Sequence, residues 1–245
     1  MGIKKFIQKK ASNFINTIKF CYDYIKFGQL QTTPPRLPMS WFFRRPILNE
    51  NTKDTYFDAH YIYHPAWAAR VLAEIAPLTH IDISSSLHFC SIVSSFINIE
   101  FFDYRPAQLN LDNLSCKYAN ILDLPFSDNS VLSLSCMHVI EHIGLGRYGD
   151  PLDPDGDLKA IVELKRVIKP GGNLIIVVPV GKPRIQFNAH RIYDATSFSK
   201  YFDNLELIEF AIVTDSQQFF RHKSPGDYKE QKYACGCFHF RKNDK

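Results

Sequence analysis

The 245-residue sequence has no run of about twenty consecutive apolar residues, which is the length that an α-helix needs to cross a bilayer. Its first residues lack an apolar core followed by a small-residue cleavage site, so we expect no secretory signal peptide. Internal repeats and low-complexity tracts are also missing. These absences predict a cytoplasmic protein without a membrane span.

The spacing of cysteines excludes another class of structure. The six cysteines stand at positions 21, 90, 116, 136, 235 and 237, and no paired spacing would bring four of them together. A four-cysteine zinc site is therefore not expected, and the lack of a disulfide framework fits a reducing cytoplasm. Cys90 and Cys136 lie in apolar runs typical of a core, and Cys235-Gly236-Cys237 indicates a strand with small buried thiols.

Basic residues are concentrated near the N-terminus. Residues 1–45 hold nine Lys and Arg against one acidic residue, which leaves twenty against twenty-four in the remainder. With 45% hydrophobic residues, the chain can bury one sizeable core and carry an appendage. A clustered positive segment points to a membrane surface, nucleic acid or an acidic partner, or else to a solvated tail. Of the binding partners we expect the membrane surface and no nucleic acid.

Residues 3–26 have the pattern of a basic amphipathic helix, in which apolar residues recur at helical spacing with lysines between them. Such a helix would make peripheral contact with the inner face of a membrane. Gly28 and the proline-rich stretch 32–38 should end it. The cluster Trp41-Phe42-Phe43-Arg44-Arg45 then touches lipid headgroups or packs on the domain, and we favour packing. Three parts follow: a helix in 1–30, a linker in 31–55 and a main domain in 56–245.

Short apolar runs alternate with helical patterns through the main domain. Strands are expected at 80–83, 99–103, 131–137, 174–178, 205–213 and 233–241, and helices at 65–76, 87–97 and 156–168. This alternation predicts an α/β fold with a doubly wound, mostly parallel sheet and helices on both faces. Sheets of this kind bind ligands at the carboxyl ends of their strands.

Three stretches carry a resemblance to a known family. Asn120-Ile121-Leu122-Asp123-Leu124-Pro125-Phe126 precedes an apolar strand, His138-Val139-Ile140-Glu141-His142 follows it, and Glu163 to Gly172 leads into another strand. This order resembles the second half of a class I S-adenosylmethionine (SAM) dependent methyltransferase, of the type seen in ubiquinone and menaquinone methylation. Loop 144–157 further resembles an uncharacterised methyltransferase-like family associated with surface-polysaccharide genes. The resemblance covers residues 58–241 and implies a Rossmann-like, seven-stranded sheet with SAM as cofactor.

The resemblance assigns the cofactor site to the ends of the first strands. The family's Asp-x-Gly-x-Gly-x-Gly turn corresponds to Asp82-Ile83-Ser84-Ser85-Ser86, where Ser84 and Ser86 would hold the amino-acid end of SAM. Asp103 would accept hydrogen bonds from both ribose hydroxyls. Asn120 and Ile121 would contact the adenine, and His138 would lie beside the sulfonium. Because serine replaces glycine in the turn, the alternative is a fold that has kept its shape and lost its ligand.

The segment His138-x-x-Glu141-His142 also matches an inverted zinc-protease signature, in which two histidines one turn apart bind a metal. That signature needs a continuous helix, whereas a strand leads directly into these residues and two glycines follow them. We therefore expect no metal at His138 and His142, and none elsewhere in the chain.

Two polar stretches are expected to recognise the methyl acceptor, because long connections rich in polar groups often form lids or binding loops. They are loop 144–157 and the segment 182–193 after the fifth strand. The predicted substrate-binding residues are Arg147, Tyr148, Arg184 and Tyr193. The candidate general bases are His142 and His190, with Asp150 behind them.

The sequence therefore predicts a SAM-dependent methyltransferase that acts on a small-molecule or glycan acceptor, with oxygen as the methylated atom. Methyl transfer can proceed mostly by approach and alignment, because the reagent is already activated. The alternative is a catalytically silent binding or scaffold protein in a membrane-associated glycan-assembly complex. The serine-rich turn favours the alternative, and the intact later segments favour the enzyme.

Overall fold

The computed structural model describes residues 3–244, with side-chain surroundings from Lys10 onward. The chain divides into two compact units, Met1–Phe57 and Asp58–Lys245, and each is described by itself. Lys4, Lys5 and Lys9 of the basic segment lie outside the residues whose side chains are described.

The first unit is built on one long helix, α1 (Ile3–Leu30). This helix continues through Gly28 and ends at Leu30, the end of the predicted 1–30 segment. A single glycine costs a helix only about 1 kcal/mol, whereas the prolines that follow cannot continue it. The aromatic cluster forms a short 3-10 helix, η1 (Trp41–Phe43), and the Trp41 ring packs edge-on against Tyr24 of α1 with centroids 5.0 Å apart.

One face of α1 presents an apolar stripe. Phe14, Ile18, Tyr22 and Ile25 follow one another at spacings of three or four residues, and each side chain is more than half exposed. The segment after η1 returns to the helix, where Asn49 exchanges side-chain hydrogen bonds with its asparagines. Among the described residues, no helix is both long enough and apolar enough to span a bilayer.

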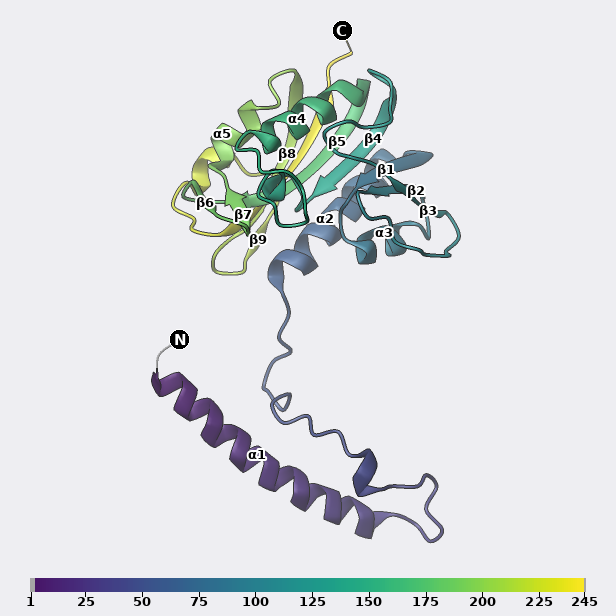
Figure 1. Cartoon of the computed structure of the whole chain (residues 1–245), viewed down its shortest axis with the longest axis vertical. Helices are drawn as coiled ribbons and strands as arrows, with labels where there is room; N and C mark the ends of the chain where they lie inside the picture. Colours follow the sequence, from purple (N-terminus) through teal and green to yellow (C-terminus); the bar gives the residue numbers. More distant parts are fainter. Residues whose placement is uncertain (1–2, 245) are drawn as a thin grey trace. The chain divides into compact units, whose positions relative to one another are not determined.

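The second unit contains an eight-stranded sheet with the order β3-β2-β1-β4-β5-β10-β8-β9 (Figure 1). The strands are β1 (Thr79–Ile83), β2 (Asn98–Asp103), β3 (Leu114–Tyr118), β4 (Val131–Met137), β5 (Ile168–Val180), β8 (Leu205–Val213), β9 (Phe219–Phe220) and β10 (Ala234–Lys242). Strands β1 to β5 pair in parallel, and β10 runs antiparallel between β5 and β8. The predicted mostly parallel sheet is confirmed, and the short edge strand β9 adds one strand to the expected seven.

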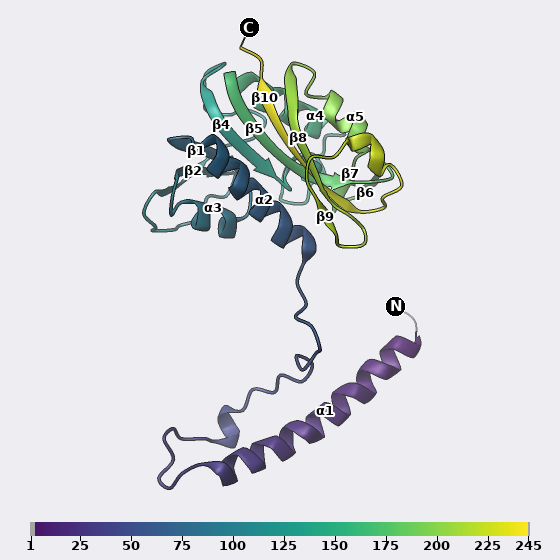
Figure 2. The same cartoon turned by 180° about the vertical axis from the view of Figure 1, so that it is seen from behind.

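Helices cover both faces of this sheet (Figures 1 and 2). They are α2 (Ala59–Ile75) and α3 (Leu87–Val93) on one face, and α4 (Gly156–Val167) and α5 (Ala195–Lys200) on the other. Two buried apolar clusters match these layers. The first includes Trp67 of α2 and Phe89 of α3, and the second includes Leu164 of α4 and Phe198 of α5. The doubly wound architecture is therefore built on two cores.

Helix α2 begins six residues before its expected start at Pro65. Asp58 is the N-cap, and its carboxylate accepts a hydrogen bond from the Tyr61 N–H at 3.3 Å. Such a cap satisfies one of the backbone donors that a helix start leaves free, and Pro65 is carried inside the helix. The early start brings His60 and Tyr61 onto a regular helix.

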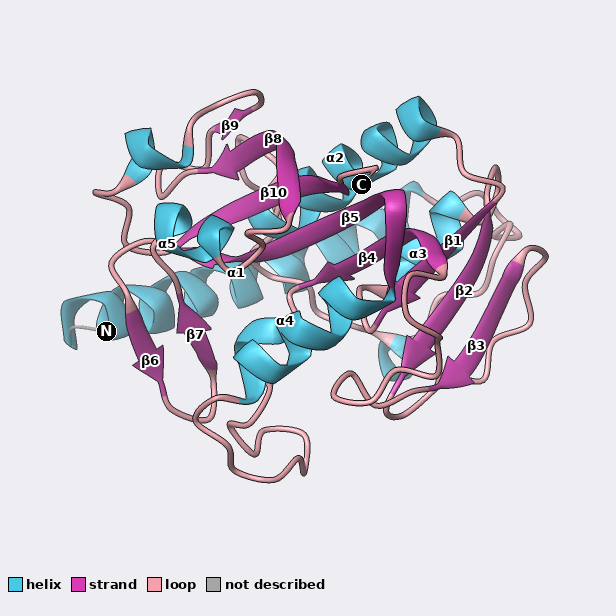
Figure 3. Cartoon of the chain, turned by 90° about the horizontal axis from the view of Figure 1, so that it is seen from above, coloured by secondary structure: helices cyan, strands magenta, loops and turns pink. Residues whose placement is uncertain are grey.

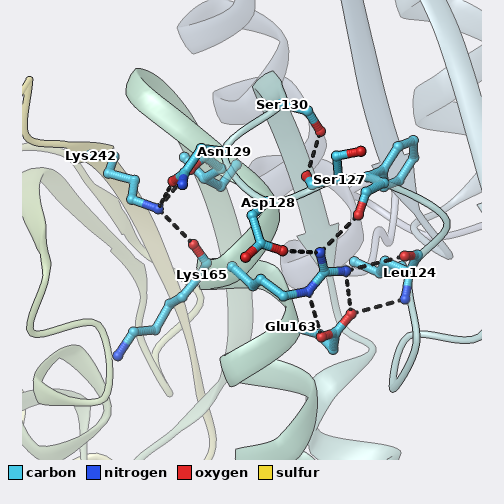
Figure 4. A network of polar contacts seen from close by, with 11 residues as sticks. Leu124, Ser127, Asp128, Asn129, Ser130, Glu163, Lys165 and Lys242 are labelled. Atoms are coloured by element: carbon cyan, nitrogen blue, oxygen red, sulfur yellow. Dashed lines mark hydrogen bonds and ion pairs between the residues drawn. The ribbon is translucent and has the colours of Figure 1, made fainter.

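Arg166 fastens the loop before β4 to helix α4. Its guanidinium donates to the Glu163 carboxylate and the Asp128 carboxylate, at 2.8 and 2.7 Å, and to the Phe126 carbonyl at 2.8 Å. Glu163 in turn accepts the Leu124 N–H at 3.0 Å, as Figure 4 shows. Segment 163–166 therefore has a structural role.

A separate hairpin, β6 (Arg184–Gln186) and β7 (His190–Ile192), extends beyond the sheet (Figure 3). Arg191 of this hairpin is 5% exposed and donates to the carbonyl oxygens of Ile143 and Pro154, at 2.6 and 3.0 Å. These bonds tie the hairpin to the loop that follows β4. The two polar stretches expected to bind the acceptor are therefore neighbours.

Candidate functional site

Three strand ends meet at one edge of the sheet. The register of β1 with β2 places Ser84 level with Asp103. The Ser85 hydroxyl accepts a hydrogen bond from the Met137 N–H at the end of β4 (3.0 Å), so His138 follows at the same edge. Strand β2 lies on one side of β1, and β4 lies on its other side. This is the topological switch point, where open α/β sheets bind ligands.

The turn after β1 keeps a glycine-like conformation without a glycine. Ser84 has φ of +55°, a left-handed conformation that costs a residue with a Cβ more than it costs glycine. Its N–H donates to the Phe102 carbonyl at 2.8 Å, and the Ser85 N–H donates to the Asp82 carboxylate at 3.0 Å. The protein itself therefore uses two backbone donors of the turn. Ser86 is the N-cap of α3 but makes no capping hydrogen bond through its side chain.

Asp82 is fully buried, so it lies beneath the turn and not in the crevice where cofactor contact was expected. Its carboxylate accepts a hydrogen bond from the Ser135 hydroxyl, which also lies 2.8 Å from Nε2 of buried His80. Burial raises the pKa of Asp82 to about 6, although the bonds from Ser135 and Ser85 oppose this rise. Burial lowers the pKa of His80 to about 3. Asp82 thus supports the turn from inside the sheet.

Asp103 is better placed than Asp82 to contact a cofactor. It is partly exposed, and one of its carboxylate oxygens accepts the Arg105 N–H at 2.7 Å. The other oxygen has no hydrogen-bond partner within residues 3–244, which fits the predicted acceptor role toward ribose hydroxyls. The Asn120 side chain accepts the Leu122 N–H at 3.0 Å, and Ile121 is only 8% exposed. Ile121 therefore packs into the core and offers little surface to an adenine ring.

A cavity of about 570 Å³ lies beside the end of β4. Its lining is rich in imidazole, phenol and other polar groups, and it includes five of the residues predicted from the sequence: His138, His142, Arg147, Tyr148 and His190. The remaining lining residues are His60, Tyr61, Glu141, Phe187, Asn188, Ala189 and Tyr233. The cavity can therefore hold a polar ligand next to the switch point.

His138 and Glu141 form a buried pair in the cavity wall. His138 has φ of +57°, and Glu141 belongs to the 3-10 turn η2 (Ile140–His142). Nδ1 of His138 lies 2.8 Å from Oε1 of Glu141, which is 1% exposed. Burial opposes protonation of His138, but the Cys235 sulfur and the Glu141 carboxylate outweigh it and raise the pKa to about 10. Oε2 of Glu141 has no hydrogen-bond partner among the described residues.

His142 and His190, the two candidate general bases, both line the cavity. Nδ1 of His142 lies 2.6 Å from the Ala189 carbonyl oxygen, so this nitrogen carries the proton and Nε2 is left as an acceptor. Nε2 of His190 is buried without a partner in the described part of the chain. Burial lowers the pKa of both imidazoles. Both are therefore neutral at pH 7 and able to take up a proton.

Three of the residues predicted for catalysis or acceptor binding lie outside the cavity lining. Asp150 accepts the Gly144 N–H at 2.7 Å, and although burial opposes it, this and other backbone bonds lower its pKa. Arg184 donates to the carbonyl oxygens of Lys182 and Lys232. Tyr193 is 9% exposed and donates to the Asp157 carboxylate at 2.9 Å. Asp150 therefore shapes its own loop, Arg184 fixes the start of the hairpin, and Tyr193 belongs to the core.

His60, Glu141 and Tyr233 line the cavity but were not predicted as site residues. Glu141 was named in the family segment after β4 and in a zinc-protease signature, but it was given no role. That signature is not formed because η2 spans three residues and no continuous helix joins the two histidines. For His60 a signal existed, because His60 and His64 are one helical turn apart. It was not used because the helix was expected to start at Pro65.

The family comparison matches this part of the molecule. Residues 109–232, half of the chain, match a family described as "Caenorhabditis protein of unknown function, DUF268". The chain belongs to this family. The matched range begins after β2 and includes β4, η2 and the β6–β7 hairpin. The DUF268 region therefore holds most of the cavity wall, while Ser84 and Asp103 lie before it.

A search of curated proteins gives a relative from Methanocaldococcus jannaschii, an uncharacterised protein that is 33% identical over 105 residues. The match covers 42% of this chain and 40% of that protein. The chain thus aligns with about two fifths of the relative's length, and the relative supplies no activity to compare.

Solved structures show the fold. A chain from the Haloferax volcanii complex between the Trm112 methyltransferase activator and a proposed methyltransferase is 17% identical, with a TM-score of 0.52 over 76% of this chain and 90% of that one. The 1,6-didemethyltoxoflavin-N1-methyltransferase of Burkholderia thailandensis is 10% identical, with a TM-score of 0.52 over 74% and 79%. The [4+2]-cyclase SpnF is 14% identical, with a TM-score of 0.50 over 73% and 82%. The fold is that of class I SAM-dependent methyltransferases, and the cyclase among its neighbours means that fold alone does not establish the reaction.

Proposed function

We propose that this protein is a SAM-dependent methyltransferase that transfers a methyl group to a hydroxyl oxygen of a small-molecule or glycan acceptor. The observation that carries the proposal is the position of the cavity, which reaches the switch point of a methyltransferase fold through His138. A ligand in this cavity would lie beside the place where such sheets hold a nucleotide-like cofactor.

The residues at the strand ends fit part of the cofactor. Asp103 has one carboxylate oxygen without a partner within residues 3–244, and an acceptor at this position suits the two ribose hydroxyls of SAM. The Ser86 side chain makes no capping bond and is available to the amino-acid end. When bound, SAM would supply a methyl group that is already activated for displacement.

The chain's own contribution is then alignment and proton removal. The imidazoles, phenols and Arg147 around the cavity offer hydrogen bonds to a hydroxylated acceptor. His142 is neutral and presents Nε2 as an acceptor, so it can take the hydroxyl proton as the oxygen attacks the methyl carbon. The methyl group would leave with its sulfur–carbon electron pair kept on the sulfur of the demethylated product, and His142 would hold the proton released from the acceptor hydroxyl.

Titration calorimetry with SAM and its demethylated product tests the cofactor part of the proposal. Asp103→Ala should weaken binding about 10- to 100-fold, because two hydrogen bonds to a carboxylate are lost. Asp112→Ala is a matched control, since Asp112 is an exposed acid at the amino end of β3, away from the carboxyl ends of the strands. Absence of binding heat with the unchanged protein, or equal affinities in the two variants, would contradict the assignment.

Transfer of labelled methyl from SAM to a panel of sugars, nucleotide sugars, lipids and small acids tests the reaction. His142→Ala should lower turnover about 10²- to 10⁴-fold and leave SAM affinity unchanged, whereas the exposed His222→Ala should retain activity. Turnover should stay constant through neutral pH and fall only at a pH lower than that of an ordinary imidazole, because burial lowers the pKa of His142 and keeps Nε2 unprotonated at neutral pH. Transfer only to protein or nucleic acid would show that the acceptor class is wrong.

A second candidate function is a catalytically silent binding or scaffold protein in a glycan-assembly complex. It is favoured by the turn after β1, where Ser84 and Ser85 direct their N–H groups to protein acceptors. Tight SAM binding without transfer to any acceptor would support this candidate over the enzyme.

The apolar stripe of α1 supports a further part of the proposal, a peripheral contact with membrane. Exposed Phe14, Ile18, Tyr22 and Ile25 share the helix with lysines, a combination that suits insertion into the headgroup region of anionic lipid. Such a contact would bring the enzyme close to lipid-linked acceptors.

A further inference from the structure

Three side chains from distant parts of the chain converge at the cavity wall, two of them in its lining and one buried. His60 comes from α2, His138 from the end of β4 and Cys235 from β10. One potential ligand atom from each lies within 4.8 Å of the other two. Nε2 of His138 and Sγ of Cys235 are 3.5 Å apart, and Cys235 is fully buried.

The separation of 3.5 Å matches two ligands of one tetrahedral ion. Zinc binds imidazole nitrogen at about 2.0–2.1 Å and thiolate sulfur at about 2.3 Å, which at a tetrahedral angle separates nitrogen from sulfur by about 3.6 Å. The observed distance between His138 and Cys235 needs no rearrangement to reach this value. The ligand atom of His60 lies within 4.8 Å of the other two, so the His60 side chain would have to move closer on metal binding to become the third ligand.

Glu141 provides an independent observation. Its Oε1 lies 2.8 Å from Nδ1 of His138, so Nδ1–H donates to Glu141 and Nε2 faces Cys235. A metal ion at this position would replace the proton on Nε2. A carboxylate behind a histidine is the usual outer contact of a zinc-bound imidazole, because it fixes the tautomer and raises the basicity of the ligand. Glu141 is 1% exposed, and its Oε2 has no hydrogen-bond partner among the described residues. A buried carboxylate with an unsatisfied oxygen is costly unless positive charge lies nearby, and a metal ion bound to His138 would supply that charge in place of the second imidazole proton.

We propose that His60, His138 and Cys235 bind a Zn²⁺ ion whose fourth coordination position opens toward the cavity. The Cys235 thiolate and the Glu141 carboxylate would together balance its two positive charges. Three protein ligands with one open position are the arrangement of catalytic zinc sites. The ion would polarise an oxygen of a ligand held in the cavity. This site goes beyond the proposed methyl transfer and does not depend on it.

No metal was expected from the sequence because His138 was considered as a ligand only together with His142. Nδ1 of His142 is bonded to the Ala189 carbonyl oxygen, and His142 is not one of the three converging residues. The proposed ligands are separated by 78 and 97 positions in the sequence. No local motif could have connected them.

Elemental analysis of the full chain, expressed with zinc and purified without an affinity tag, is the first test. One equivalent of zinc per chain is expected. Protein stripped with a chelator should bind Co²⁺ with an intense thiolate-to-cobalt absorption, which reports the sulfur ligand directly. A chain free of zinc that also gives no such absorption on adding Co²⁺ would overturn the proposal.

Variants then test the ligand set. Cys235→Ala and His60→Ala should lose stoichiometric metal, and Cys235→Ala should lose the cobalt–thiolate absorption. Glu141→Gln should lower metal affinity about 10- to 100-fold, because the outer contact is weakened and the chain's shape is kept. Cys237→Ala is the matched control: Cys237 is equally buried on the same strand, with Sγ 4.0 Å from that of Cys235.

Circular dichroism of each variant establishes that the fold is retained. Metal and cobalt absorption kept in Cys235→Ala, or lost equally in Cys237→Ala, would contradict the assignment. Because every readout is metal content or absorption, failure of this proposal is distinguishable from failure of methyl transfer.

Discussion

At the scale of single residues, the most consequential feature is a chain of buried polar groups between β1 and β4. Asp82 and His80 are both fully buried and meet at the Ser135 hydroxyl. Burial disfavours the charged form of each, so the pKa of Asp82 is raised to about 6 and that of His80 is lowered to about 3. The two groups therefore link stability to pH in opposite directions.

The first prediction concerns Asp82→Asn. With a folded pKa of about 6 and an unfolded pKa near 3.8, native Asp82 binds a proton before the unfolded chain does. Its contribution to the free energy of unfolding therefore rises as pH falls from about 6 to 3.8, by about 1.4 kcal/mol per pH unit. Asparagine lacks this term, so the native protein should gain about 1 kcal/mol relative to the variant between pH 7.5 and pH 5.

Urea unfolding of both proteins at the two pH values measures this difference. His80 and all other titrating groups are common to both proteins, so their contributions cancel. Parallel pH dependence of the two unfolding free energies would mean that Asp82 has an ordinary pKa in the folded protein.

How far residues could be assigned from the sequence depended on whether their partners were local. Arg147, Tyr148 and His190 could be named from the sequence because long polar connections at a strand edge are a local signal. All three line the cavity. Tyr193 carried the same signal but is buried against Asp157, and a spacing pattern cannot tell a phenol that faces solvent from one that faces inward. His60 was not assigned because its helix was expected to start later, at Pro65, and because its partners come from β4 and β10.

At the scale of elements, periodicity predicted most of the sheet. The bounds of β4 and β8 agree with the expected 131–137 and 205–213, because continuous apolar runs of this length are typical of buried strands. Strand β3 and the β6–β7 hairpin were not predicted, since their residues are mostly exposed or partly buried and show no apolar run. Helix α2 was predicted too short because Pro65 was treated as its first turn, although Asp58 is its cap.

The second prediction concerns α1. Its apolar stripe should partition into vesicles that contain anionic lipid, and binding should weaken with salt because exposed charges are screened. Ile18→Ser with Ile25→Ser should lower partitioning more than tenfold, since burying each isoleucine is worth about 1.5 kcal/mol or more. Vesicle sedimentation measures the bound fraction.

The matched control is Ile62→Ser with Ile92→Ser, two isoleucines of the second unit that are also more than half exposed. Equal loss of binding in both double variants would assign the effect to general hydrophobicity. Equal pelleting of the native chain with neutral and anionic vesicles would remove the electrostatic part of the hypothesis.

At the scale of the whole molecule, stability and chemistry belong to the second unit. Both buried apolar clusters are made of residues from Ala59 onward, and every residue that lines the cavity is from the same unit. The DUF268 match also lies entirely within it. None of the described side chains of residues 10–57 belongs to either cluster.

The last prediction follows from this division. A variant that lacks residues 1–54 should unfold with the same free energy as the second unit of the full chain, because none of the described core residues is removed.

Adding Asp58→Ala to the shortened chain should lower that free energy by about 1 kcal/mol, since the Tyr61 N–H loses its capping acceptor. The same substitution loosens the first turn of α2, which holds His60, so zinc affinity should fall along with stability. Denaturant unfolding and metal titration of the three proteins measure both effects. A large loss of stability on removing residues 1–54 alone would show that the first unit supports the fold, and an Asp58→Ala variant with unchanged stability would show that the cap does not fix the start of α2.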